Sequence, residues 1–235
     1  MLTKIFHAII IFSYVFVLWY DQMYIDFPEF MQPKKADGEI FKGRLNFLTI
    51  WNLFLQTAFF TICLLNDFIG TNEVNPKTKP LIRKIRDIIL ATLAFPSSLI
   101  VVVSFWLIYT VDTGLLIPKG FEVFLPTWIN HMMHTNVIFF VLIQMYISYH
   151  EYPSRVVGVS ILTTFILSYL AWIHINYASS GRWPYPILEV LNLPLRSLLF
   201  AALFGSALLW FILGEKLNRI LWTITLEVRK RRKHN

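Results

Sequence analysis

The chain has 235 residues, of which 56% are hydrophobic and 17% aromatic, and its formal net charge is +7. Only 15% of the residues are charged, against about 25% in an ordinary soluble domain. This balance excludes an ordinary soluble fold and predicts a chain that lies in a bilayer. There the positive charge serves topology and contact with anionic lipid headgroups, and binding of nucleic acid is not expected.

A helix that spans a membrane needs about 20 apolar residues, and the chain contains six candidate runs. They cover about residues 4–20, 45–65, 88–109, 128–149, 156–177 and 195–213. The first run ends without a small-residue cleavage site, so we expect an uncleaved anchor. The sequence therefore predicts an all-α polytopic membrane protein, a bundle of six transmembrane helices in a single domain.

The basic residues are unevenly divided between the two sides of this predicted bundle. Fourteen of the 21 Lys and Arg residues lie in the amino terminus, the second and fourth loops and the tail, and seven lie on the opposite side. The positive-inside rule therefore puts both termini, including the basic tail of residues 216–235, in the cytosol. The tail approximates a dibasic retrieval signal. We expect an integral protein of the endoplasmic reticulum or another endomembrane, with the plasma membrane as the alternative.

A polar stripe runs along the second apolar segment. Thr49, Asn52 and Gln56 follow one another at helical spacing, so all three share one helix face. A polar stripe in a membrane helix faces other helices or a cavity. The stripe therefore predicts either hydrogen bonds between helices or a polar site within the bundle.

Two histidines, His131 and His134, lie at membrane depth near the start of the fourth segment, beside Asn130. Ionisable side chains inside a bilayer are rare and usually mark a functional site. Segments two and four begin on the same side of the membrane, and Thr49 and His134 lie roughly 6 and 9 Å inside it, at about 1.5 Å per residue. A hydroxyl and an imidazole that meet in this way form a minimal nucleophile–base pair for attack on an acyl carbon.

Spacing alone leaves other uses of these histidines open. His131 and His134 could bind a metal with His174 as a third ligand, although a spacing of three residues is a weak metal signature. The chain has six histidines, fewer than iron-dependent membrane hydroxylases require. Ligation of a haem would need paired histidines on facing helices, and only His174 is available on a further helix. The histidines could also be hydrogen-bonded core residues of a structural or signalling membrane protein.

The loop after the fifth segment, residues 181–186, is rich in aromatic residues and proline. One interpretation is an aromatic belt at the membrane interface followed by a turn. The alternative interpretation is a lid or mouth for a cavity that lipids can enter.

Several short motifs occur in a fixed order between about residue 40 and residue 218. They are Phe47-Leu48-Thr49 with Asn52-Leu53 and Gln56, Ala91-Thr92-Leu93-Ala94-Phe95-Pro96, Trp128-Ile129-Asn130-His131-Met132-Met133-His134-Thr135, Tyr152-Pro153-Ser154, Trp183-Pro184-Tyr185-Pro186 and Leu213-Gly214-Glu215-Lys216-Leu217-Asn218. In this order they resemble the androgen-induced / FAR-17a-like membrane family. The block that contains both histidines is the most specific of the motifs.

The resemblance implies a six-helix membrane enzyme. Such an enzyme is a threonine hydrolase that cleaves fatty acid esters of hydroxy fatty acids into a fatty acid and a hydroxy fatty acid. The family's nucleophile falls on Thr49 and its essential histidine on His134. Asn130 and His131 are then candidates to orient His134 or to stabilise an oxyanion. We expect no metal and no organic cofactor.

The same resemblance leaves the supporting residues less defined. Asn52 and Gln56 are candidates for indirect support of the reacting pair. Asn46 stands where family members carry lysine, so Arg44 is the candidate to hold a substrate carboxylate. The expected partners are a lipid ester and the bilayer. The alternative function is a non-catalytic lipid-binding or signalling membrane protein.

Overall fold

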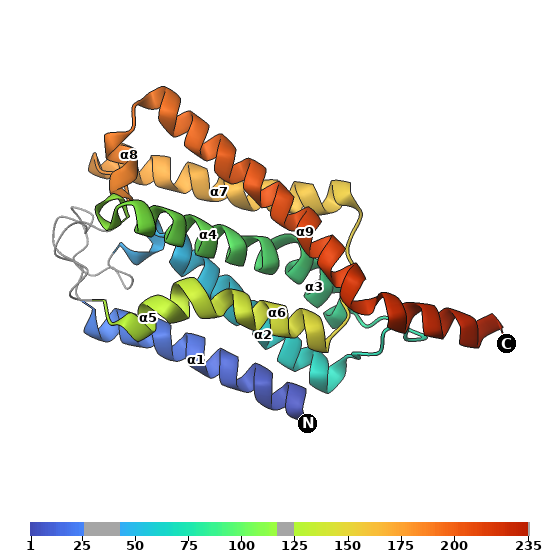
Figure 1. The fold of residues 1–235 in the computed structure, drawn as a ribbon. Helices are drawn as coiled ribbons and strands as arrows, with labels where there is room; N and C mark the ends of the chain where they lie inside the picture. The colour runs from blue at the N-terminus through green and yellow to red at the C-terminus, as the bar shows by residue number, and fades with distance from the viewer. Residues whose placement is uncertain (26–42, 117–124, 235) are drawn as a thin grey trace.

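The computed structural model describes residues 1–25, 43–116 and 125–234, with side chains up to Thr223. Every regular element in these residues is helical, and the longer helices run side by side as an elongated bundle (Figure 1). The elements are α1 Leu2–Tyr24, η2 Arg44–Asn46, α2 Leu48–Ile69, α3 Leu81–Ile89, η3 Leu90–Ala94, α4 Phe95–Val111, η4 Thr113–Leu115, α5 Thr127–His131, η5 Met132–Asn136, α6 Val137–Ile147, α7 Arg155–Ser180, α8 Pro186–Val190 and α9 Leu193–His234.

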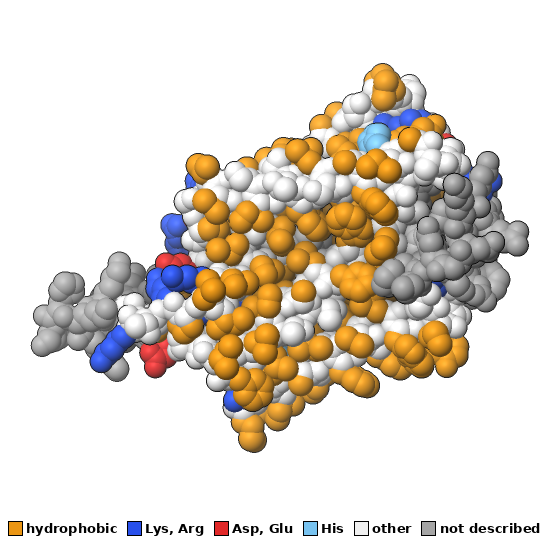
Figure 2. All heavy atoms as spheres, turned by 180° about the vertical axis from the view of Figure 1, so that it is seen from behind, with side chains coloured by type: hydrophobic (Ala, Val, Ile, Leu, Met, Phe, Trp, Pro, Cys, Tyr) orange, Lys and Arg blue, Asp and Glu red, His pale blue; other side chains and the backbone are white. Residues whose placement is uncertain are grey.

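Within the described residues, five stretches of helix are long and apolar enough to cross a membrane: α1, α2, α3 through α4, α7, and α9 up to Thr223. Apolar side chains cover much of the face in Figure 2, and Phe12 and Leu198, for example, are 72% and 64% exposed. Apolar surface of this extent is typical of contact with lipid. These observations confirm an all-helical polytopic membrane protein.

The helix made of α5, η5 and α6 is continuous over residues 127–147 but differs from these five. Polar residues between 130 and 136 lower its mean hydropathy, and these are the residues of the histidine motif. Its backbone also widens there into the π-helical turn η5. Such turns are rare and occur frequently at functional sites.

A second π-helical turn, η3, joins α3 to α4 directly before Pro96. Proline lacks a backbone N–H, and its ring collides with the carbonyl four residues earlier, here that of Thr92. The wider turn relieves this clash without ending the helix. The third span therefore stays continuous and carries α4 past the site described below.

The helices α7 and α9 meet closely at one end and separate toward α8 at the other (Figure 1). At the close end, a Cβ added to Gly158 would lie 2.4 Å from the ring of Phe211, so only glycine allows this approach. Leu162, Ala207 and Phe211 are packed there with at most 1% of their surface exposed. Toward α8 a cavity lies between these helices, and the site lies in that part.

A buried polar network ties the helices together at the end away from α8. The ring of His7 on α1 lies 2.9 Å from the carboxylate of Asp67 on α2 and 2.7 Å from the amide oxygen of Gln144 on α6. His150, which follows α6, lies 3.0 Å from the carboxylate of Asp87 on α3. These pairs fix four helices relative to one another, so they also fix the relative positions of α2 and α6 at the site.

Candidate active site

The helix that carries Thr49 begins at Leu48 rather than at Leu45, where the apolar run starts. Residues 44–46 form the turn η2, and Phe47 is extended, with φ −99° and ψ 130°. Gly43 precedes this turn at φ 79°, a left-handed conformation that favours glycine. Thr49 is therefore the second residue of α2, where backbone N–H groups have no carbonyl partner in a preceding turn.

The structure brings Thr49 and His134 together. The hydroxyl oxygen of Thr49 lies 3.1 Å from Nε2 of His134, which η5 presents to the start of α2. The two residues are separated by 85 positions in the chain and lie on different helices. A distance of 3.1 Å allows a direct hydrogen bond, so the hydroxyl can pass its proton to the imidazole without an intervening group.

Asn130 fixes the tautomer of this imidazole. Nδ1 of His134 lies 2.8 Å from the side-chain oxygen of Asn130 and 3.1 Å from its backbone carbonyl oxygen. Because a carbonyl oxygen can only accept, Nδ1 carries the ring proton and donates it. Nε2 therefore faces Thr49 as an acceptor. This is the tautomer that a general base for Thr49 requires.

Aromatic side chains hold the imidazole in place. The ring of Phe105 stacks on His134, with ring centroids 3.6 Å apart and an interplanar angle of 12°. The indole N–H of Trp106 donates to the backbone carbonyl of His134 at 2.7 Å. His134 is only 6% exposed, so its ring is enclosed by the surrounding side chains. Neither aromatic residue lies in one of the sequence motifs, so neither was predicted at the site.

Removing the side chain of Asn130 should weaken activity without abolishing it. In Asn130→Ala the backbone carbonyl still accepts from Nδ1, but the stronger bond to the developing imidazolium is lost. Such a bond is worth about 1.5–3 kcal/mol, which is a roughly ten- to 150-fold lower kcat. Asn130→Asp restores an acceptor and should recover most of the rate. Equal rates for the alanine variant and the wild type in a steady-state ester assay would remove Asn130 from the site.

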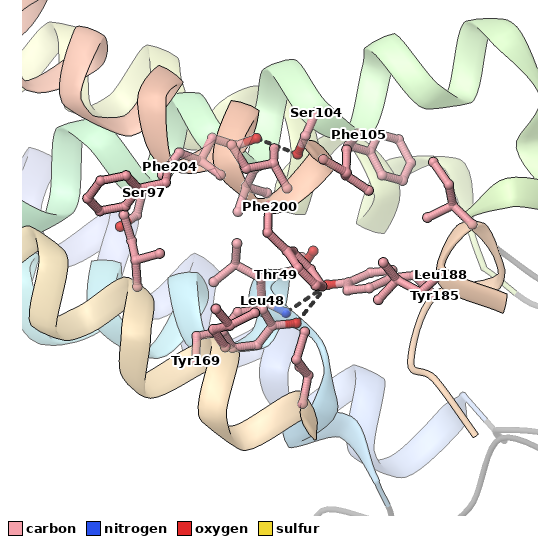
Figure 3. Close-up of a pocket in the computed structure, with 18 of the residues that line it drawn as sticks. Leu48, Thr49, Ser97, Ser104, Phe105, Tyr169, Tyr185, Leu188, Phe200 and Phe204 are labelled. Carbon is pink, nitrogen blue, oxygen red and sulfur yellow. Dashed lines mark hydrogen bonds between the residues drawn. The ribbon is translucent and has the colours of Figure 1, made fainter. Parts of the chain in front are cut away.

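An apolar cavity of about 360 Å³ opens beside Thr49, between α2, α4, α7, α8 and α9 (Figure 3). None of the described residues that line it is charged. Its polar lining residues are Thr49, Ser97, Ser104, Tyr169 and Tyr185, and its apolar lining residues are Leu48, Ile100, Val101, Phe105, Ile108, Leu116, Phe165, Ile166, Leu167, Leu170, Ile173, Ile187, Leu188, Leu199, Phe200, Ala201, Leu203 and Phe204. A concave apolar site with a few convergent polar groups is typical of small-ligand binding.

The cavity reaches the outer surface between α7 and α9. Leu167 on α7 and Ala201 on α9 both line it, yet both are exposed. In a membrane, these exposed residues face lipid. A lipid could therefore reach the Thr49 hydroxyl from the bilayer without crossing water.

Two half-buried tyrosines anchor the start of α2. The backbone N–H of Leu48 donates to the hydroxyl of Tyr185 at 2.9 Å, and that hydroxyl lies 3.1 Å from the hydroxyl of Tyr169 (Figure 3). The Tyr169 hydroxyl in turn donates to the backbone carbonyl of Asn46 at 2.9 Å. The aromatic loop thus contributes Tyr185 to the cavity wall.

These bonds leave one N–H group at the start of α2 without a partner. The N–H groups of Ile50 and Trp51 donate to the carbonyl of Phe47, and that of Leu48 donates to Tyr185. Among the described residues, the N–H of Thr49 donates to no other group. It lies beside the cavity, at the positive end of a helix dipole, where an oxyanion would be stabilised.

Three of the predicted supporting residues make other contacts. The amide nitrogen of Gln56 donates to Asn52 at 3.1 Å and to the carbonyl of Ala94 at 2.8 Å, so the lower part of the polar stripe links α2 to the third span. His131 is exposed and lies 3.0 Å from the hydroxyl of Thr135. The contacts of Gln56 fit the interpretation that the stripe packs helices together. The ring of His131 stacks on Trp106, so His131 can affect His134 only indirectly, through Trp106.

Arg44 is buried away from the cavity lining. It pairs with the carboxylate of Asp21 and donates to the backbone carbonyl of Ile25, and only 2% of its surface is exposed. This arrangement anchors η2 to the end of α1. It does not favour the predicted contact between Arg44 and a substrate carboxylate.

A three-ligand metal site is not formed by the described residues. Among them, no group of three or more His, Cys, Asp or Glu could hold a metal ion. His174, the candidate third ligand, lies 2.8 Å from the carbonyl of Leu170 through Nδ1 and packs against Trp183. The expectation that the reaction needs no metal remains a prediction.

The fold and the site together define a class of protein. It is a polytopic helical membrane protein with a Thr–His–Asn cluster at the wall of an apolar cavity. The chain belongs to the FAR-17a/AIG1-like protein family, whose model matches residues 3–219. This match confirms the resemblance seen in the motifs.

Two kinds of relative are similar to most of the chain. The androgen-induced gene 1 protein of Homo sapiens is 38% identical over 191 residues, which cover 78% of this chain and 80% of that protein. The androgen-dependent TFPI-regulating protein of Rattus norvegicus is 33% identical over 98% of this chain and 97% of its own length. The human protein of that name is 30% identical over 98% of each chain. No solved structure matches the chain significantly.

Proposed function

We propose that this protein is an intramembrane lipid ester hydrolase with Thr49 as nucleophile and His134 as base. The observation that carries the proposal is the 3.1 Å contact between the Thr49 hydroxyl and a correctly tautomerised His134, at the wall of an apolar cavity. A hydroxyl is a weak nucleophile at its ordinary pKa and needs such an adjacent base. The substrate class follows the family resemblance, namely fatty acid esters of hydroxy fatty acids.

In the first step the Thr49 oxygen attacks the ester carbonyl while Nε2 of His134 takes the hydroxyl proton. The carbonyl oxygen becomes an oxyanion that the Thr49 N–H stabilises. When the intermediate collapses, the bond to the alcohol oxygen breaks and His134 returns the proton to it. The hydroxy fatty acid leaves, and the fatty acyl group stays on Thr49 as an ester.

In the second step a water molecule replaces the alcohol. His134 takes a proton from the water as its oxygen attacks the acyl carbon, and the bond to Thr49 then breaks. The Thr49 oxygen recovers its proton from His134 and the fatty acid leaves. Hydrolysis of a lipid ester panel by the purified protein and by Thr49→Ala tests the proposal.

The uncharged cavity lining also restricts how such a substrate binds. A carboxylate in this cavity would have no charged partner among the described lining residues, and an unpaired buried charge costs several kcal/mol. The free carboxylate of the hydroxy acid therefore stays at the membrane interface. Hydrocarbon occupies the cavity.

We further propose that the helix of residues 127–147 is a sixth span and that both termini are cytosolic. The basic residues favour this orientation, although the side chains of residues 224–235 lie outside the described part. Glycosylation acceptors placed in the loop of residues 181–185 should be modified, whereas acceptors in the tail should not. A modified tail would reverse the orientation and move the site to the other leaflet.

Activity should survive strong chelators and need no added metal. The reaction as proposed uses only a hydroxyl, an imidazole and water, and a catalytic zinc site would require three protein ligands. Turnover should therefore be equal before and after dialysis against a chelator. A bound metal present in equal amount to the protein, whose removal abolishes turnover, would restore the metalloenzyme alternative.

The second candidate function is a non-catalytic lipid-binding protein, which the cavity alone would also fit. A lipid carrier needs no base beside Thr49, so the two functions differ in the reactivity of one hydroxyl. An activated phosphonate probe should label Thr49 only if His134 activates it. Binding of lipids with no hydrolysis and no labelling would favour the carrier.

A further inference from the structure

One part of the cavity extends from Thr49 into the bundle and ends at packed side chains. Phe105, which stacks on His134, and Ser97 both line it on α4, eight residues apart, which corresponds to roughly 12 Å of helix. Figure 3 shows Ser97 and Phe204 at one end, Tyr185 and Leu188 at the other, and Thr49 between them. The end at Ser97 and Phe204 is called the inner end below.

Beyond the inner end the helices leave little room. Leu162 and Ala207 are fully buried and Phe211 is 1% exposed, and these residues of α7 and α9 form one packed cluster with Ala91. Gly158 brings α7 directly against Phe211 at this level. A chain that runs from Thr49 toward the inner end therefore meets Phe204 and the packed cluster beyond it.

The geometry of the reaction decides which chain enters. The carbon of the tetrahedral intermediate carries the Thr49 oxygen, the oxyanion, the alcohol oxygen and the acyl chain. The alcohol oxygen must lie near Nε2 of His134 to receive its proton. His134 is not a lining residue of the cavity, whereas Thr49 is. The acyl chain is therefore the group that points into the cavity.

We propose that the cavity is the acyl-chain site and that Phe204 sets the longest acyl chain that the protein accepts. The proposal rests on the proposed function and adds to it which half of the ester is selected by length. The cavity does not select the length of the half of the ester that leaves as the alcohol. Ser97 lies at the same inner end and is fully buried, and its hydroxyl has no partner among the described residues, so a larger side chain there would shorten the cavity.

The test uses the purified full-length protein and two ester series. In the first series the alcohol is fixed and the acyl chain is lengthened step by step, and in the second the acyl chain is fixed and the alcohol is lengthened. Phe204→Ala should raise kcat/KM for acyl chains longer than the wild-type optimum by about tenfold relative to that optimum, since one misfitting methylene in an apolar pocket is worth at least that factor. Ser97→Leu should shift the acyl optimum to shorter chains.

Three controls separate the possible outcomes. Phe139→Ala removes the same side chain from an exposed position on α6 outside the cavity, and it should leave both profiles unchanged. Each readout is a ratio between esters, so the fraction of folded protein does not affect it. An unchanged acyl profile, or a shift in the alcohol series instead, would overturn the acyl-chain site. If Thr49→Ala still hydrolysed the optimal ester, the proposed function itself would be wrong.

Discussion

Thr49→Ala should abolish ester hydrolysis while the protein still inserts into membranes and is produced at normal levels. The substitution removes the oxygen that forms the acyl-enzyme, and no other hydroxyl lies as close to His134 in the described contacts. Loss of a nucleophile costs at least on the order of 10⁴-fold in kcat. Steady-state hydrolysis of a lipid ester panel, normalised to protein content, measures the loss.

Thr49→Ser is the matched control for this prediction. It keeps the hydroxyl and loses only a methyl group, so hydrolysis should remain measurable, with at most about a 10- to 200-fold decrease from poorer fit. If the alanine and serine variants were equally inactive, the methyl group or the fold would be responsible rather than the nucleophile. Full turnover by Thr49→Ala would return the residue to a packing role.

His134→Gln should lower kcat nearly as far as Thr49→Ala. The glutamine can still form a hydrogen bond to Thr49, but it cannot accept the hydroxyl proton, so the attack lacks a base. The double variant should be no worse than either single variant, because members of a nucleophile–base unit act together. Kinetics of both single variants and the double variant, compared on the same ester, measure this non-additivity.

Additive losses in the double variant would indicate that His134 acts apart from Thr49. His131→Gln is the control, since His131 contacts Thr135 and Trp106 and is exposed. Its effect should be much smaller. A loss in His131→Gln as large as in His134→Gln would move the base to the other histidine of the motif.

The apolar runs of the sequence, and the polar residues within them, predicted much of the fold and of the site. Runs of apolar residues indicated the helical membrane fold, and the predicted depths of Thr49 and His134 placed them at one level of the bilayer. Depth follows from counting residues, because the rise per residue of a helix is fixed. The family motifs then singled out these two residues from the other polar positions.

The rotation and tilt of the helices could not be predicted in the same way. The stacking of Phe105 on His134 depends on the rotation of α4 about its own axis relative to η5. The π-helical turn η3, before Pro96, changes this rotation locally. Tyr185 lies far from Leu48 in the chain, so no periodicity links them. Arg44 was predicted to hold a substrate carboxylate because Asn46 stands where family members carry lysine. Its partner Asp21 lies on another helix, so the sequence around Arg44 does not reveal this pairing.

Mass spectrometry of the protein after treatment with an activated phosphonate probe tests the nucleophile assignment most directly. The account predicts one adduct, on the peptide that contains Thr49, with hydrolytic activity lost in proportion to labelling and with no adduct in Thr49→Ala or His134→Gln. An adduct on Ser97 or Ser104, the other aliphatic hydroxyls of the cavity wall, or labelling of Thr49 that leaves ester hydrolysis intact, would contradict it.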